Sequence, residues 1–169
     1  HRNHGRSFHT QSMDYAAMAE DVRTLIIQQA LAAPILIGHS MGGKTAMQFA
    51  AMYPDFIDKL VIVDIGPQAY EGGHQAIFDA MFSVDLENTE SRKDIQDQLS
   101  KSIDDPSVLL FLMKNLSRLP EGGYRWKMNL DSLYKNYDRI LEAMPNDELF
   151  DDETLFIRGA NSNYIAPGG

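Results

Sequence analysis

The stretch that most constrains this chain runs from residue 34 to residue 44, with the sequence PILIGHSMGGK. The apolar run 35–37 leads into Gly-His-Ser-Met-Gly, and a segment with apolar residues at helical spacing follows at once. A Gly-x-Ser-x-Gly pattern between a strand and a helix is typical of a sharp turn that raises the serine above the end of a sheet. We therefore predict Ser40 as a nucleophile, with Gly38 and Gly42 letting strand and helix approach closely. The alternative is an ordinary strand-to-helix turn that contains a serine.

Composition narrows the class of protein. The chain has 169 residues, of which 44% are hydrophobic, which indicates a globular domain with a core of its own. Its net charge of -9 argues against a nucleic-acid partner. Cysteine is absent, so disulfides and thiolate metal sites are excluded, and no apolar run approaches the roughly 20 residues of a membrane helix. We expect a cytoplasmic protein without a membrane span.

The first part of the chain alternates between helical and strand patterns. Apolar residues at three- and four-residue spacing predict a helix over 13–31, with Tyr15, Met18, Val22, Leu25 and Ile26 on one face. A strand at 34–38, a helix at about 41–53 and a nearly continuous apolar strand at 59–65 follow. This order predicts an α/β fold with a parallel sheet and helices on both of its faces.

The alternation breaks after residue 67. Helical patterns recur at 74–84, 90–103, 106–116 and 130–143 without a clear core strand between them, and strand character returns at 154–159. We expect residues 1–67 and 149–169 to form part of an α/β core, with 68–148 inserted as a helical cap over the Ser40 end of the sheet.

Apolar residues of this insertion are candidates for an acyl-binding pocket, because methionine and aromatic side chains suit varied apolar ligands. Together with the neighbour of the nucleophile, the candidate substrate-binding residues are His39, Phe78, Met81, Phe82, Phe111 and Trp126. The alternative, which we favour for any single one of the apolar residues, is that it belongs to the insertion's own core.

Acidic residues gather before the last predicted strand, at Asp147, Glu148, Asp151, Asp152 and Glu153. The cluster is typical of a solvated turn. A metal site is the alternative, but no histidine interleaves the carboxylates, and we expect no metal.

A serine hydroxyl needs a base that is oriented by an acid. Asp64 lies at the end of the strand that follows the predicted turn, 24 residues after Ser40. The other place where such an acid could lie is the loop 159–163, after the last predicted strand, and this loop contains no carboxylate. Asp64 is therefore the predicted acid, both by position and by elimination. The alternative is that Asp64 caps the turn before Gly66-Pro67.

The base is harder to place. On a strand–turn–helix unit of this kind, the chain order is serine, acid and then a histidine beyond the last strands. The five histidines are His1, His4, His9, His39 and His74, and none follows residue 74. We expect the base to be absent from this chain. The backbone N–H of Met41, directly after the nucleophile, is the predicted oxyanion donor.

Four motifs occur in order along the chain: RNHGxS at 2–7, GHSMGGK at 38–44, VDIGP at 63–67 and GANSxY at 159–164. With these motifs the chain resembles the α/β-hydrolase superfamily, and more narrowly the YbfF-type small bacterial esterases and their mitochondrial relatives. The resemblance implies a nucleophile at Ser40, an acid at Asp64, and hydrolysis of carboxylic esters or acyl-CoA thioesters of small molecules without a cofactor.

The resemblance also has gaps. The family's early strands, with a second oxyanion donor, and its C-terminal Gly-His segment have no counterpart here. We therefore expect an internal fragment that is inactive by itself.

Other functions remain open on this fold. Dehalogenases and epoxide hydrolases need aspartate at the position of Ser40, which argues against them. Lyases and peptidases with the same serine, acid and histidine differ in pocket shape rather than in motif, and a non-catalytic binding protein is also possible on this fold.

Overall fold

The computed structural model describes residues 1–144, 150–162 and 164–165. Contacts divide the chain into two units. Unit 1 consists of His1–Arg2, Ser12–Tyr70 and Asn136–Gly169, and unit 2 consists of Asn3–Gln11 and Glu71–Lys135. The sequence grouped residues 3–11 with the sheet, whereas their contacts in the folded chain are with unit 2.

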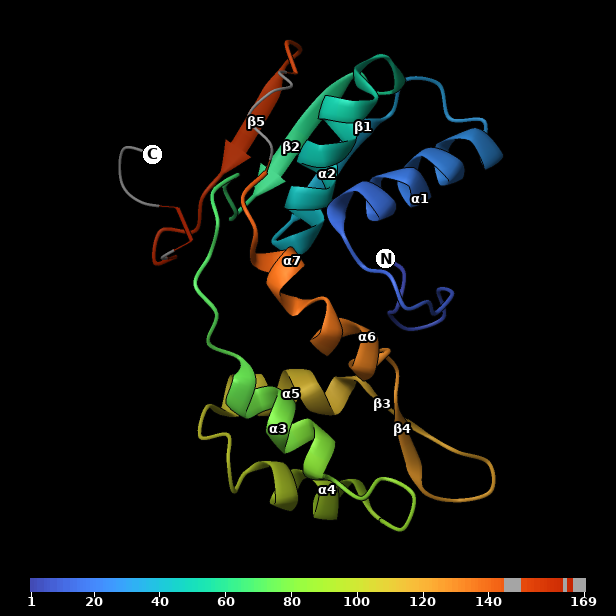
Figure 1. The fold of residues 1–169 in the computed structure, drawn as a ribbon, viewed down its shortest axis with the longest axis vertical. Helices are drawn as coiled ribbons and strands as arrows, with labels where there is room; N and C mark the ends of the chain where they lie inside the picture. Colours follow the sequence, from blue (N-terminus) through green and yellow to red (C-terminus); the bar gives the residue numbers. More distant parts are fainter. Residues whose placement is uncertain (145–149, 163, 166–169) are drawn as a thin grey trace. The chain divides into compact units, whose positions relative to one another are not determined.

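The sheet of unit 1 has the order β1-β2-β5, formed by β1 (Ile35–His39), β2 (Lys59–Val63) and β5 (Thr154–Ile157) (Figure 1). Both pairs are parallel, which confirms the predicted α/β architecture. The register pairs His39 with Val63 and Val63 with Ile157, so the three strands end at the same level.

Two long helices build the core of unit 1. α1 (Tyr15–Gln28) begins after Asp14, whose carboxylate accepts the N–H of Ala17 at 2.8 Å. α2 (Met41–Met52) follows β1 directly and ends before the short 3₁₀ helix η1 (Pro54–Phe56). The core consists of Ala19, Ile26, Ala46, Phe49, Ala50, Ile57, Leu60, Ile62 and Ile65. Leu25, predicted on the buried face of α1, is 54% exposed.

The sequence predicted helices on both faces of the sheet, but among the described residues of unit 1 only one face carries α1 and α2. α2 packs against β1 and β2, and α1 packs against α2. Alternation along β1 places Leu36 against this core, whereas Ile35 and Ile37 are 55% and 66% exposed. Among the described residues, these two isoleucines therefore belong to an uncovered face of the sheet.

Unit 2 is mostly helical, as the sequence predicted for this stretch. Its helices are α3 (Gln75–Ser83), α4 (Arg92–Leu99), α5 (Pro106–Lys114) and α6 (Leu130–Lys135). Asp105 accepts the N–H of Ser107 at 2.7 Å, and Pro106 is the first helical residue of α5. The helices enclose a core in which Ile95 and Leu99 are fully buried.

Two features of the region 116–141 differ from the prediction. The expected helix over 130–143 is divided at Asn136 into α6 and α7 (Tyr137–Leu141), and α7 belongs to unit 1. An antiparallel hairpin of β3 (Leu116–Arg118) and β4 (Tyr124–Trp126) was missed. Each strand has three residues, which is too short for a readable alternation.

A helix that crosses a lipid bilayer must be both long and apolar. Across the described ranges, no helix combines the length and the apolar character that a membrane crossing requires.

Candidate active site

Ser40 lies in the turn between β1 and α2. Its backbone has φ 52° and ψ -126°, a conformation that non-glycine residues rarely adopt. The turn is held on both sides, because the Ser40 N–H donates to the Val63 carbonyl at 3.1 Å and the Ser40 carbonyl accepts the N–H of Gly43 at 2.7 Å. The Ser40 side chain makes no capping hydrogen bond to α2. The strained turn thus presents a hydroxyl that the helix does not use.

Close packing around this turn explains two glycines. A Cβ on Gly38 would lie 2.2 Å from the Gly42 carbonyl oxygen, and a Cβ on Gly43 would lie 2.4 Å from Cγ2 of Ile65. A Cβ on Gly42 would meet only Nε2 of His1, at 3.3 Å. The close approach expected at Gly38 is therefore present, while the second glycine that requires it is Gly43 rather than Gly42.

The start of α2 points backbone donors toward this turn. Gly43 and Lys44 donate their N–H groups to the Ser40 carbonyl, at 2.7 and 3.2 Å. Met41 precedes them as the first residue of the helix, where an N–H has no acceptor within the helix. Its N–H, next to Ser40, lies at the positive end of the helix dipole, which favours an anion.

Asp64 follows β2 with φ 55°. Its N–H donates to the Ile157 carbonyl at 2.7 Å, and its Oδ1 accepts the N–H of Gly159 at 2.9 Å. This backbone bond, with a further bond from the Ser162 hydroxyl and the nearby His39, holds the pKa of Asp64 below its usual range. The carboxylate is therefore ionised at neutral pH.

Ser40 and Asp64 come directly after paired positions of neighbouring strands. His39 pairs with Val63, so Ser40 and Asp64, the residues that follow them, lie at the same edge of the sheet. This is the edge at which the strands have their carboxyl ends. Crevices at this edge of parallel sheets are the usual place of ligand sites. The loop after β5 contains no carboxylate, but it supplies Gly159 and Ser162 as partners of Asp64. The sequence carried no signal for that role.

The remaining candidate pocket residues lie in different settings. His39 is exposed at the end of β1. In unit 2, Met81 is buried in the core, Phe78 packs at the edge of that core, and Phe82 and Phe111 are exposed. Trp126 lines a cavity within unit 2.

Lys44 is a feature that the sequence analysis missed. It is 1% exposed, and its Nζ donates to the Glu142 carbonyl while lying 5.6 and 4.9 Å from the ring centroids of Tyr15 and Tyr70. Burial lowers its pKa. A lysine four positions after Ser40, on a helix otherwise rich in small and apolar residues, was the available signal.

Lys44 meets two segments that are themselves paired. The Tyr70 N–H donates to the Leu141 carbonyl at 2.9 Å, and the Met144 N–H donates to the Pro67 carbonyl at 2.7 Å. The buried ammonium thus ties the start of α2 to the places where the chain leaves and re-enters unit 1.

The structure describes only part of the predicted acidic cluster. Asp147 and Glu148 lie outside the described residues, Asp151 and Asp152 are exposed, and Glu153 pairs with Lys59. Within the described ranges, no three histidine or carboxylate side chains are grouped so that they could hold a metal ion.

Comparison with known proteins places this geometry in context. A family model described as the alpha/beta hydrolase fold matches residues 1–166. A Haemophilus influenzae protein named as an esterase/lipase is 41% identical over 165 residues, which cover 97% of this chain and 56% of that protein. Esterase YbfF of Escherichia coli is 34% identical over 98% of this chain and 63% of its own length.

A solved esterase structure is also similar to this chain. An esterase from a marine microorganism aligns with a TM-score of 0.92 and 42% identity, covering 98% of this chain and 66% of that one. The chain spans 56% and 63% of the two curated relatives above.

Proposed function

Because this chain belongs to the α/β-hydrolase family, we propose that its protein hydrolyses carboxylic esters of small molecules through an acyl-enzyme on Ser40. The observation that carries the proposal is the backbone of Ser40, at φ 52° between β1 and α2, with the ionised Asp64 at the same edge of the sheet. Serine hydrolases place the nucleophile on such a strained turn, and an acid nearby holds the histidine that activates the hydroxyl.

The proposed reaction has two steps. Ser40 Oγ attacks the ester carbonyl carbon while a histidine takes its proton, and the same histidine returns that proton to the departing alcohol. Water then attacks the carbonyl carbon of the acyl-enzyme and gives a proton to the histidine, which passes that proton to Ser40 Oγ as the bond to the acyl group breaks and the acid is released. The Met41 N–H would stabilise the negative charge on the carbonyl oxygen, and Asp64 would orient the histidine and stabilise its charged form.

The histidine itself is assigned outside these 169 residues, because the chain order serine, acid, histidine requires it after Asp64 and beyond the last strands. His74 is the histidine that follows Asp64 here, and it belongs to unit 2. Acyl-CoA thioesters are proposed as further substrates, since attack occurs at the same carbonyl carbon and a thiol leaves more readily than an alcohol.

Turnover of a short p-nitrophenyl ester by the natural full-length protein tests the proposal. Ser40→Ala should lower kcat by about a thousandfold or more, because no acyl-enzyme can form. A fluorophosphonate probe should label the wild-type protein at Ser40 and should leave the variant unlabelled. Ser100→Ala, which removes an exposed hydroxyl in unit 2, is the matched control and should behave as wild type. Undiminished turnover in Ser40→Ala would contradict the proposal.

A further inference from the structure

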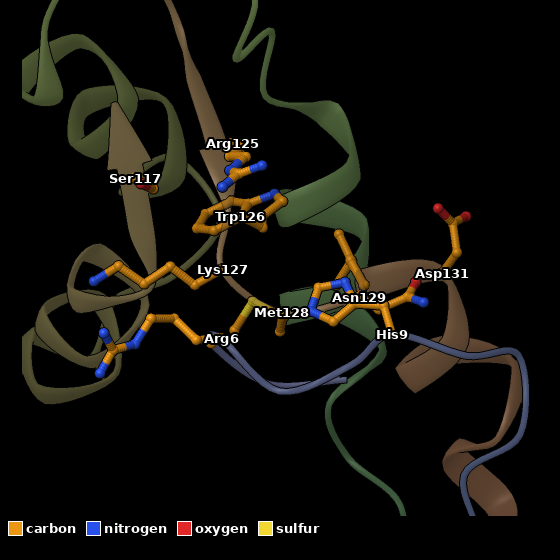
Figure 2. Close-up of a pocket in the computed structure, with 11 residues that line it drawn as sticks. Arg6, His9, Ser117, Arg125, Trp126, Lys127, Met128, Asn129 and Asp131 are labelled. Atoms are coloured by element: carbon orange, nitrogen blue, oxygen red, sulfur yellow. The ribbon is translucent and has the colours of Figure 1, made fainter. Parts of the chain in front are cut away.

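Unit 2 contains a cavity of about 610 Å³, whose lining includes neither Ser40 nor Asp64. Its volume falls in the range of about 300–1,000 Å³ that small-molecule sites occupy. Residues from three parts of unit 2 line it: the loop 3–11, the hairpin of β3 and β4, and the segment 127–131, which leads from β4 into α6. Figure 2 shows Arg6 and Lys127 extending toward the same side of this cavity.

The wall formed by the loop is held in place by buried polar contacts. Asn3 is fully buried, and its Nδ2 donates to Ser132 Oγ at 3.0 Å, while its Oδ1 accepts the N–H of Thr10 at 2.8 Å. The Asn129 N–H donates to the Asn3 carbonyl at 2.9 Å, and His4 and Met128 form an isolated antiparallel β-bridge. The loop that carries Arg6 is therefore fixed on the segment after β4, so the cavity is preformed.

The charge around the cavity is positive in a chain whose net charge is -9. Arg6, Arg125 and Lys127 line it, with Asp131 as the one carboxylate among the lining residues. Lys127 is positioned by its Nζ, which donates to the Lys114 carbonyl at 2.7 Å, a neutral partner that leaves the charge uncompensated. Three cations against one carboxylate leave a surplus of positive charge, which an anion would balance.

The chemistry of the lining selects among anions. Guanidinium groups bind phosphate through paired hydrogen bonds, and an ammonium adds a point charge. A phosphate ester carries about two negative charges at neutral pH, which fits this surplus better than a single carboxylate does. Trp126 lines the same cavity, and an indole face is a platform on which a planar ring can stack.

We propose that this cavity binds an organic phosphate that carries a planar ring, as nucleotides do. Arg6, Arg125 and Lys127 bind the phosphate, and Trp126 stacks on the ring. All residues of the site belong to unit 2, and none of them is Ser40 or Asp64.

Trp126 lines this site, so the difference in tryptophan fluorescence between the full-length wild-type protein and Trp126→Phe reports on it. ADP is the probe, followed by tryptophan fluorescence and by isothermal titration calorimetry. ADP should give a saturable change, whereas adenosine and octanoate should give none, since they lack the phosphate. Arg6→Gln and Arg125→Gln should each weaken ADP binding by about tenfold or more, because each removes a charged hydrogen-bond donor to phosphate.

Arg118→Gln is the matched control. Arg118 is an exposed arginine on the same hairpin, and it does not line this cavity. It should leave ADP affinity within about twofold, because a charge outside the site acts only through screened long-range attraction. Ser40→Ala should bind ADP as wild type does, which separates this site from the proposed catalysis. Arg6 and Arg125 are exposed, so melting curves should show that their variants keep the fold.

Three results would overturn the proposal. They are the absence of a saturable response to millimolar ADP, equal binding of adenosine or octanoate, and a loss of affinity in Arg118→Gln as large as that in Arg125→Gln.

Discussion

Ser40 and Asp64 share an unusual backbone. Both have positive φ values, 52° and 55°, and both come directly after a strand of the same sheet. Such conformations cost energy in non-glycine residues and persist only where the surroundings enforce them. Here the Val63 and Ile157 carbonyls accept the N–H groups of the two residues, so the sheet itself enforces both turns. This placement is the residue-scale reason to treat them as one site.

Asp64→Asn separates the proposed acid from a simple turn cap. We expect kcat for ester hydrolysis by the full-length protein to fall by about a thousandfold or more, because an amide favours the wrong histidine tautomer. The melting temperature should change little, since an asparagine oxygen can still accept the Gly159 N–H. Turnover and melting are measured on the same preparations. Near-normal turnover would remove Asp64 from the proposed site.

The lowered pKa of Asp64 also predicts a pH dependence of stability. The folded state holds the ionised carboxylate through Gly159 and Ser162, so the pKa lies below the ordinary value of 3.8. This stabilisation is complete above the unfolded pKa and is lost as pH falls through the lower folded pKa. Wild-type protein should therefore lose more stability than Asp64→Asn as the pH falls below about 4. Thermal melts at a series of pH values test this, and parallel losses in both proteins would contradict it.

At the scale of elements, the junction of β1 and α2 depends on two close contacts. Gly38→Ala and Gly43→Ala should each destabilise the fold by about 1–3 kcal/mol or more, because the added Cβ overlaps backbone at Gly38 and a core side chain at Gly43. Gly42→Ala is the matched comparison and should cost less than either, since its Cβ meets only a histidine side chain. Denaturant unfolding of the three variants measures this order. Equal losses would mean that the junction does not depend on these approaches.

Lys44 connects α2 with the segments around Tyr70 and Glu142. Lys44→Ala should lower the free energy of unfolding by about 2–3 kcal/mol, because it empties the space of a long buried side chain. Lys44→Met keeps most of that volume and should cost less than about 1 kcal/mol, since the exposed Glu142 can turn its carbonyl to water. Chemical denaturation compares the two. If methionine costs as much as alanine, the hydrogen bond to Glu142 rather than packing holds this contact.

At the scale of the whole molecule, the two units have separate cores. Trp126 lies in unit 2, so its fluorescence reports on that unit, while circular dichroism reports on both. We expect Leu99→Ala, in the core of unit 2, to cost about 2–5 kcal/mol and to shift the fluorescence transition most. Phe49→Ala, in the core of unit 1, should shift the circular dichroism transition and leave the fluorescence transition near its wild-type position. Coincident transitions in both variants would show that the units unfold as one.

The sequence by itself determined the features that depend on neighbouring residues. The apolar run before Ser40, the glycines around it and the helical spacing after it specify a strand, a tight turn and a helix, because each follows from local backbone and periodicity. The parallel order of β1 and β2 also followed, since a short helical crossover makes such strands neighbours. After residue 67 the strand pattern is lost and helical spacing recurs. This spacing predicted the helices of unit 2, because helical periodicity is also a property of neighbouring residues.

Tertiary structure alone decided what distant segments contribute. Gly159 and Ser162 reach Asp64 from the far end of the chain, and Lys44 is buried by side chains that no local pattern links to it. The grouping of residues 3–11 with unit 2, and the cationic cavity that results, have the same origin. Contacts between residues far apart in sequence depend on how the chain returns on itself. The spacing of residues in the sequence does not predict which distant segments come into contact, so these features could be seen only in the folded protein.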